Sequence, residues 1–362
     1  MRLQTATVAG STKASEERYR LVSSLRVYDE LPLVLAPYLS AISQPRFRSE
    51  VVNTDDRGFR FSWGPGGVIE SDSWGPSGGR GLVLGGSFVF GIGATHDRHT
   101  LVSALNSILS ASFLNLGIRA GNSLQEFLTA IPFMEQAEVV IVCSGLNNLL
   151  VSLQSLGTHE RLGPLFAEEA FEALVDYSIT DLASVLRASL DRVSSRVLIR
   201  EIASRARQRL SWFAGKRSAP EHPPVSPPTL SPEQVERATA ESLRRQGRDL
   251  VMLRRSLPRD ATLIFAAQPF ADATSKARCP EEMRLFRLAD DLQGRHWQIM
   301  KTCLTELWPR YVARLRLLCE SEGIPFTDLN ALELEGWCYV DRAHMTDHGY
   351  RQVAHRLATA LG

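Results

Sequence analysis

A serine follows two glycines directly after a short apolar run, in Gly85-Gly86-Ser87. The apolar stretch 81–84 has the length and composition of a buried strand, so the strand would end where the serine begins. Parallel α/β sheets bind their ligands at the carboxyl ends of their strands, and glycine lets backbone amides approach a reacting oxygen closely. The triplet therefore indicates either an ordinary tight turn or a nucleophilic hydroxyl at a sheet edge.

An aspartate and a histidine are spaced closely near the end of the sequence, in Asp341-Arg-Ala-His344. A carboxylate that orients an imidazole is what a serine nucleophile needs, because the imidazole must accept the hydroxyl proton. The alternative is a loop that only leads into the terminal helix, with Thr346 or Asp347 as the N-cap residue.

A third polar segment, Gly145-Leu-Asn147, follows the apolar run 138–143. An amide at the end of such a strand would lie at the same sheet edge as Ser87. There it could donate a hydrogen bond to a developing oxyanion, a role worth about 3–4 kcal/mol in other enzymes. The alternative is a helix N-cap asparagine.

A fourth segment contains glycines after the apolar run 112–116. The backbone N–H of Gly121, or that of Ala120, could supply another donor to the same oxyanion. Glycine is common after strands, so this segment indicates little when taken alone.

Four other histidines favour structural explanations. His96 and His99 have no acidic or cysteine partner at metal-ligand spacing, which predicts loop or surface positions and no metal site. His348 and His355 fall on one face of the expected terminal helix, where solvent exposure explains them.

Strand-like and helix-like segments alternate from Arg80 onward. The strand-like runs are residues 81–84, 112–116, 138–143, 262–269 and 324–329. The helical patterns are residues 98–111, 123–135, 281–322 and 346–361. This alternation predicts an α/β fold with a parallel five-stranded sheet and helices on both faces.

Two long segments lie outside this alternation. Residues 1–80 form an N-terminal extension with helical spacing from Glu16 to about Ser43, which Pro32 and Pro37 interrupt, followed by Gly- and Pro-rich loops. Residues 81–362 would form the main domain, which an insertion at 150–258 interrupts. The chain therefore divides into one extended α/β domain and its insertions rather than two independent folds.

The insertion combines helical, arginine-rich and proline-rich parts. Its helical pattern at 167–213 contains most of an arginine cluster between residues 192 and 217, and a stiff proline-rich link follows. Ser231 and Gln234 have the spacing of a capping box for a helix that runs to about Ser256. We expect a helical cap near Ser87 whose arginines are solvated or contact an anionic substrate; nucleic acid is the less favoured alternative.

Composition excludes several classes of protein. The 41 Lys+Arg and 40 Asp+Glu of the 362 residues nearly cancel, which excludes a chain built to coat nucleic acid. An apolar fraction of 44% is too high for a wholly disordered chain. The N-terminus has no apolar segment typical of a secretory signal, and no run reaches membrane-span length. Five scattered cysteines show no disulfide framework, which predicts a cytoplasmic protein.

The order of the four polar segments resembles the SGNH hydrolase superfamily of GDSL-type esterases and lipases. The segments are Gly-Gly-Ser87-Phe-Val-Phe-Gly-Ile-Gly, Asn-Leu-Gly-Ile-Arg-Ala-Gly121-Asn-Ser, Gly145-Leu-Asn147-Asn148 and Asp341-Arg-Ala-His344. The preceding segment from Asn53 to Arg60 and the later Gln268-Pro269 also look like parts of that family. The sequence departs from the family's usual pattern at Gly86 and Asn148, where the family has aspartate, and has one extra residue before Gly121.

The resemblance implies a three-layer α/β/α, flavodoxin-like fold and a two-step acyl transfer. Ser87 would be the nucleophile, His344 the base and Asp341 the carboxylate that orients it. The amides of Ser87 and Gly121 and the side chain of Asn147 would bind the oxyanion. No metal or organic cofactor is implied.

The implied function is a serine esterase that acts on an ester or thioester of a small molecule, carbohydrate or biosynthetic intermediate. An anionic or carrier-bound substrate would fit the arginine-rich insertion. Neither a nucleic-acid partner nor a membrane span is expected, and the oligomeric state is left open. Two alternatives stay open: an O-acyltransferase or deacetylase that uses the same residues, and a binding protein that has lost catalysis.

Overall fold

The computed structural model describes residues 11–36, 39–75, 80–154 and 231–361. One compact unit comprises Met1–Leu165 and Leu230–Gly362, and a second unit comprises Phe166–Thr229. The described ranges all belong to the first unit. The arginine cluster, the proline-rich link and the predicted helix at 167–213 lie outside the described residues.

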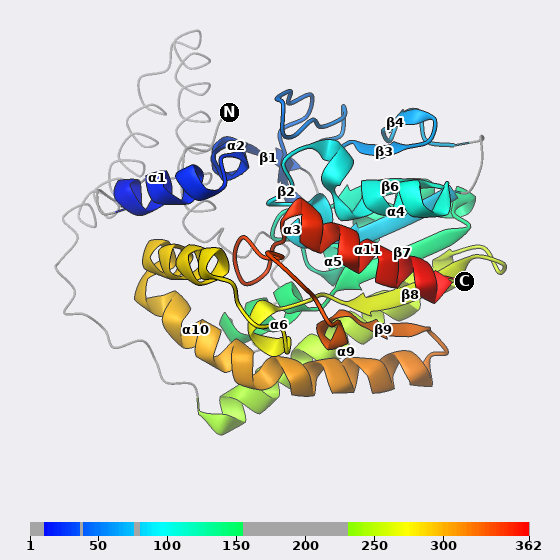
Figure 1. The fold of residues 1–362 in the computed structure, drawn as a ribbon. Helices are drawn as coiled ribbons and strands as arrows, with labels where there is room; N and C mark the ends of the chain where they lie inside the picture. The colour runs from blue at the N-terminus through cyan, green and yellow to red at the C-terminus, as the bar shows by residue number, and fades with distance from the viewer. Residues whose placement is uncertain (1–10, 37–38, 76–79, 155–230, 362) are drawn as a thin grey trace, which may run out of the picture. The chain divides into compact units, whose positions relative to one another are not determined.

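A parallel five-stranded sheet forms the centre of the first unit (Figure 1). The strands, in the order in which they lie side by side, are β6 (Ser112–Gly117), β5 (Arg80–Gly85), β7 (Val139–Ser144), β8 (Thr262–Ala267) and β9 (Phe326–Asp328). Continuous apolar runs form the central strands because both of their faces are covered. The predicted α/β class and the number of strands in this sheet are confirmed.

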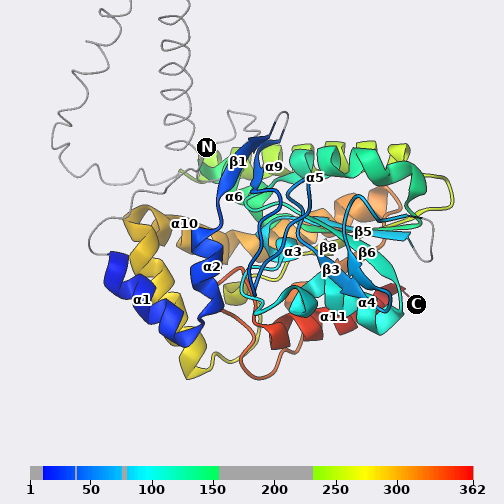
Figure 2. The same ribbon diagram turned by 90° about the horizontal axis from the view of Figure 1, so that it is seen from above.

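Helices cover both faces of the sheet and complete a three-layer α/β/α arrangement, which Figure 2 shows from above. One layer contains α4 (Leu101–Leu109) and α11 (Asp347–Leu361). The other contains α5 (Ser123–Ala130), α6 (Leu146–Gln154), α9 (Pro232–Ser256) and α10 (Pro280–Ser321). Short 3-10 turns of the described residues lie at Asp97–His99, Ile131–Gln136, Ala271–Ala273 and Leu329–Ala331.

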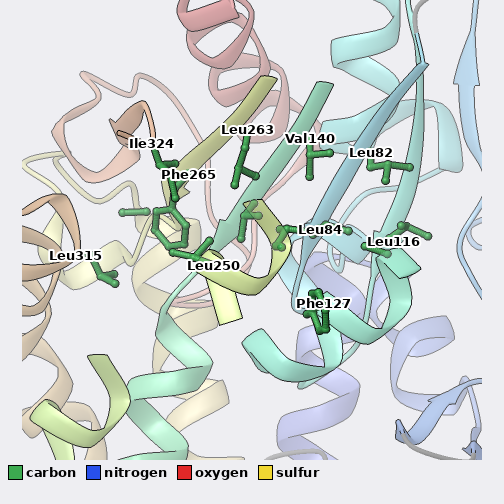
Figure 3. Close-up of a cluster of buried hydrophobic side chains, with 14 of the residues drawn as sticks. Leu82, Leu84, Leu116, Phe127, Val140, Leu250, Leu263, Phe265, Leu315 and Ile324 are labelled. Atoms are coloured by element: carbon green, nitrogen blue, oxygen red, sulfur yellow. The ribbon is translucent and has the colours of Figure 1, made fainter. Parts of the chain in front are cut away.

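Alternating side chains of β5 show why both faces need cover. Leu82 and Leu84 point into the core beneath α5, α6, α9 and α10, which Figure 3 shows, whereas Val83 packs in the core beneath α4 and α11. Successive residues of a strand point to opposite faces. The predicted three-layer fold is therefore confirmed from the packing of this chain.

Helix α9 begins where the sequence predicts. The N–H of Gln234 donates to Ser231 Oγ at 3.2 Å, and the N–H of Ser231 donates to Gln234 Oε1 at 2.8 Å. This reciprocal pair satisfies two N–H groups that would otherwise have no acceptor. The predicted capping box is confirmed, and α9 packs against α5 and α6.

The N-terminal segment is helical only as far as Glu30, just before the predicted interruption at Pro32, and the helical spacing predicted beyond it is wrong. After α1 (Ser11–Leu21) and α2 (Ser24–Glu30), the chain forms an antiparallel pair of β1 (Leu33–Ala36) and β2 (Ser40–Ser43). Proline at positions 32 and 37 explains the change, because proline ends a helix and extends the residue before it.

Part of the predicted loop region also forms strands. Residues 62–69 make a hairpin of β3 (Ser62–Gly64) and β4 (Gly67–Ile69), in which Gly67 has a φ of 110°. A left-handed conformation of this kind favours glycine. The glycines that predict a loop therefore form the turn of a hairpin.

No helix within the described ranges is long and apolar enough to cross a membrane.

Candidate active site

Ser87 is the first residue of the short helix α3 (Ser87–Phe90), directly after β5. Phe88, Val89 and Phe90 are fully buried and fix the helix in the core. Gly85 is required for this close packing, because a Cβ atom there would lie 2.4 Å from both a backbone oxygen of β7 and the side chain of Val89. The packing leaves the partly exposed Ser87 hydroxyl at the carboxyl edge of the sheet.

The loop before α11 brings the predicted base to this hydroxyl. His344 Nε2 lies 2.7 Å from Ser87 Oγ, and His344 Nδ1 lies 2.7 Å from Asp341 Oδ2. These distances are within hydrogen-bond range. The three predicted residues therefore lie together and form one hydrogen-bonded chain from carboxylate to imidazole to hydroxyl.

Asp341 is held by its own loop as well as by the imidazole. Its Oδ1 atom accepts the backbone N–H groups of Ala343 at 2.8 Å and His344 at 2.9 Å. Burial would raise the pKa of Asp341, but the charge of His344 and these hydrogen bonds hold it below its ordinary value. The carboxylate thus stays ionised and can fix the tautomer of the imidazole.

Asn147 lies in the first turn of α6 and reaches across to the loop after β6. Its Nδ2 atom donates to the carbonyl oxygen of Gly121 at 2.7 Å. A Cβ atom on Gly86 would lie only 2.5 Å from the same Nδ2 atom. The amide therefore occupies the space beside the backbone that leads into Ser87, which is where an oxyanion donor belongs.

A steric contact explains the glycine at position 86, because the Asn147 amide leaves no room for a Cβ atom there. Its backbone has a φ of −82°, which other residues adopt readily, so only the Asn147 amide excludes a side chain. We expect Gly86→Ala to change the unfolding temperature little, because a flexible amide can move aside. For the ester hydrolysis that the family resemblance implies, the displaced amide should lower kcat by up to about 10²–10³-fold. A Gly66→Ala variant is the control, since a Cβ atom there meets nothing within 4 Å; unchanged kcat in Gly86→Ala would contradict this account.

Gly121 has a role at the site that its sequence context did not reveal. Its N–H donates to the carbonyl oxygen of Ile118 at 3.0 Å, which closes a turn around Ala120. Ala120 has a φ of 59°, in the left-handed region. Gly121 thus contributes its carbonyl oxygen, which holds Asn147, while its N–H closes the turn.

Asn148 is explained by its neighbours. Its Nδ2 atom donates to Ser123 Oγ at 2.7 Å, and its Oδ1 atom accepts the Ser123 N–H at 3.0 Å. Ser123 Oγ in turn donates to Asp249 of α9 at 2.6 Å. A carboxylate at position 148 would face Asp249 across one hydroxyl, so asparagine suits the local charge.

Glu126 of α5 is a buried acid beside this network. Its Oε1 atom accepts from Ser144 Oγ at 2.6 Å, while its Oε2 atom has no hydrogen-bond partner among the described residues. Burial raises the pKa of Glu126 to about 8, against the smaller lowering effect of Ser144, and the nearby charge of Asp249 adds to the rise. The sequence offers no signal for it, because Glu126 resembles any acidic residue in the first turn of a helix.

The raised pKa of Glu126 predicts a pH-dependent stability. The contribution of Glu126 to the unfolding free energy is fully present below the pKa of this side chain in the unfolded chain, near 4.3. It is lost as the pH rises through about 8, the pKa in the folded chain. We expect Glu126→Gln to gain about 2–4 kcal/mol relative to the wild type between pH 5 and pH 8. Urea unfolding at both pH values measures this difference, and an equal effect of the substitution at both would contradict it.

Arg60, from the N-terminal segment, lies fully buried behind α3. Its Nε atom pairs with Asp97 at 2.8 Å, and its terminal nitrogens donate to Tyr28 Oη at 2.7 Å, Gly91 O at 2.8 Å and Val51 O at 2.7 Å. The hydrogen bond to Gly91 fixes the end of the helix that Ser87 begins. The resemblance pointed to the segment around Arg60, but no sequence pattern assigned it this role.

The four histidines that the sequence assigns to loops or to a solvated helix face lie there. His348 and His355 are exposed on α11, and His96 and His99 lie in and beside the turn after α3. His99 Nδ1 lies 2.9 Å from Asp347. Within the described ranges, no group of three His, Cys, Asp or Glu side chains could hold a metal ion.

Comparison with known proteins finds similarity at the level of structure only. No protein-family model matches the sequence, and no curated protein matches it. A carbohydrate acetylesterase family member from Sinorhizobium meliloti is 10% identical with a TM-score of 0.41, and the match covers 78% of this chain and 97% of that chain. An extracellular lipase from Streptomyces rimosus is 9% identical with a TM-score of 0.41, over 78% of this chain and 99% of that chain. Both likenesses are distant, so the chemistry follows from the chain's own residues.

Proposed function

We propose that this chain is a serine esterase of the SGNH hydrolase type. The observation that supports this most directly is the hydrogen-bonded chain from Asp341 through His344 to Ser87. An imidazole within 2.7 Å of the hydroxyl can accept its proton as the oxygen attacks. The four sequence segments that resemble the family also meet at one sheet edge.

The proposed reaction begins with attack of Ser87 Oγ on the carbonyl carbon of an ester. His344 Nε2 accepts the serine proton and then donates it to the leaving alcohol, which leaves an acyl-enzyme. Water then attacks the acyl carbon and gives a proton to His344. The bond between the acyl carbon and Ser87 Oγ breaks, His344 returns the proton to Ser87 Oγ, and the acid leaves. Asp341 holds the imidazole and stabilises its charged form throughout.

The developing oxyanion needs donors beside Ser87. The N–H of Ser87 suits this role because the first N–H groups of a helix have no acceptor within it. The Asn147 amide has a second hydrogen besides the one donated to Gly121 O, so it is the other donor that we propose. The N–H of Gly121, the donor implied by the resemblance, would have to share its hydrogen with Ile118 O.

The substrate that we propose is an ester or thioester of a small molecule, carbohydrate or biosynthetic intermediate. With an alcohol in place of water as acceptor, the same residues would act as an O-acyltransferase. The intact hydrogen-bonded chain favours catalysis over a binding protein that has lost it. The helical cap over the site and the cytoplasmic location stay predictions.

A fluorophosphonate probe tests the proposal, because it labels a serine only when a base activates it. We expect one probe molecule per chain on the wild type. The Ser73→Ala variant is the control and should be labelled equally, because Ser73 is an exposed serine outside the four segments of the proposed site. Ser87→Ala should stay unlabelled while it retains the unfolding temperature of the wild type. Absence of labelling on the folded wild type, or equal labelling of Ser87→Ala, would refute the proposal.

A further inference from the structure

The turn between β6 and α5 is built from residues that need outside support. Gly121 N–H closes the turn on Ile118 O at 3.0 Å, and Ala120 between them has a φ of 59°. The left-handed region is disfavoured for a residue with a Cβ atom. Such a conformation persists only where the surrounding structure holds it.

Arg119 supplies this support by extending its side chain away from the turn into the N-terminal segment. Its terminal nitrogens donate to the carbonyl oxygens of Leu31 at 2.7 Å, Pro32 at 3.1 Å and Tyr28 at 3.2 Å. Its Nε atom donates to Ser43 Oγ at 3.1 Å. The guanidinium is thus held in a cradle of backbone oxygens from the segment between α2 and β2.

The dipoles of the surrounding backbone carbonyl groups stabilise the positive charge of Arg119. Burial lowers the pKa of Arg119 to about 10, and the charge of Asp29 opposes this only in part. The guanidinium therefore stays charged at neutral pH, and its planar fork of donors can bind several oxygens at fixed angles. A lysine could not make the same set of bonds.

The start of α5 is tied to the same N-terminal segment. Gln125 Nε2 donates to the carbonyl oxygen of Leu39 at 2.6 Å. Gln125 Oε1 also accepts the N–H of Asn122 at 3.0 Å, directly after the turn. Both ends of the turn are therefore anchored by residues 28–43.

The anchored turn in turn holds the amide of Asn147, because Gly121 O accepts its Nδ2 hydrogen at 2.7 Å. A continuous path of contacts leads from the N-terminal carbonyls through Arg119 and Gly121 to the proposed oxyanion donor. Misplacing a catalytic group by about 1 Å can cost about 10² in rate.

We propose that Arg119 is a positioning residue for the Asn147 amide and that the N-terminal segment is the scaffold of the oxyanion site. This inference rests on the proposed function. In this proposal Arg119 does not contact the substrate. It fixes the conformation of the turn between β6 and α5, and the turn fixes the position of the Asn147 amide. The residues that contact Arg119 and Gln125 then contribute to the rate of the chemical step.

A double-mutant cycle in the full chain tests the proposal with p-nitrophenyl acetate as substrate. We expect Arg119→Met to lower kcat about 10- to 100-fold with little change in KM. In the Asn147→Ala background there is no amide to position, so Arg119→Met should lower kcat less than about 2-fold further. Arg57→Met, an exposed arginine of the same segment, should behave as the wild type.

If Arg119→Met does not fold, Arg119→Lys provides the same test with a smaller change. Lysine should keep some of the carbonyl contacts and show an intermediate loss of kcat, again absent in the Asn147→Ala background. Equal losses with and without Asn147 would overturn the positioning role. The proposed function is judged separately, by fluorophosphonate labelling of the wild type and of Ser87→Ala.

Discussion

A His344→Ala variant is expected to hydrolyse p-nitrophenyl acetate at least about 10³-fold more slowly than the wild type. His344 Nε2 is 2.7 Å from Ser87 Oγ, so its loss leaves the hydroxyl without a base. The loss should appear in kcat and kcat/KM together, because the imidazole acts in the transition state rather than in substrate binding. Steady-state kinetics at pH 7.5 to 8 measure both.

His355→Ala is the matched control for this prediction. His355 is exposed on α11, the helix that follows the His344 loop, so its removal should leave kcat within about 2-fold of the wild type. A His344→Ala variant that is folded and retains a tenth or more of the wild-type kcat would show that another group takes the proton.

An Arg60→Met variant is expected to lose about 3–5 kcal/mol of unfolding free energy. The side chain of Asp97 is 1% exposed, and Arg60 itself is 0% exposed, so removing the guanidinium leaves a buried carboxylate unpaired. The carbonyl oxygens of Gly91 and Val51 also lose a donor. Urea denaturation measures the loss.

An exposed pair provides the comparison for Arg60. Arg46 pairs with Asp56 at 2.6 Å, but the two side chains are 73% and 49% exposed. Arg46→Met should therefore cost no more than about 1 kcal/mol. Adding Asp97→Asn to Arg60→Met should recover part of its loss, since the unpaired charge is then removed. If Arg60→Met lowered the unfolding free energy no more than Arg46→Met does, the buried Arg60–Asp97 pair would not be important for stability.

The sheet and the positions of the candidate site residues were predictable for a physical reason. A strand covered on both faces needs a continuous apolar run. Residues 139–144 are such a run and form the buried strand β7. Parallel strands also place their carboxyl ends at one edge, so Ser87 and Asn147 had to lie near each other once both strands were assigned.

The supports of the site could not be predicted in the same way. Arg60 and Arg119 look like any surface arginine in the sequence, because nothing in a local pattern says which carbonyl oxygens surround a side chain. The carbonyl role of Gly121 depends on a turn whose left-handed residue is Ala120, where sequence alone favours glycine. The strands β1 and β2 pair with each other within the N-terminal segment, and their apolar spacing was also compatible with a helix.

The contact between Ser87 and His344 joins residues separated by 257 positions. During synthesis, the strand that ends at the serine emerges long before the base does. The His344 loop lies directly before α11, which packs on α4, so docking of that helix helps to hold the imidazole against the serine. We therefore expect the proposed catalytic activity to appear only once α11 has docked. A growing or shortened chain without α11 would present an inert hydroxyl, and turnover of a chromogenic ester during refolding would time the docking of that helix.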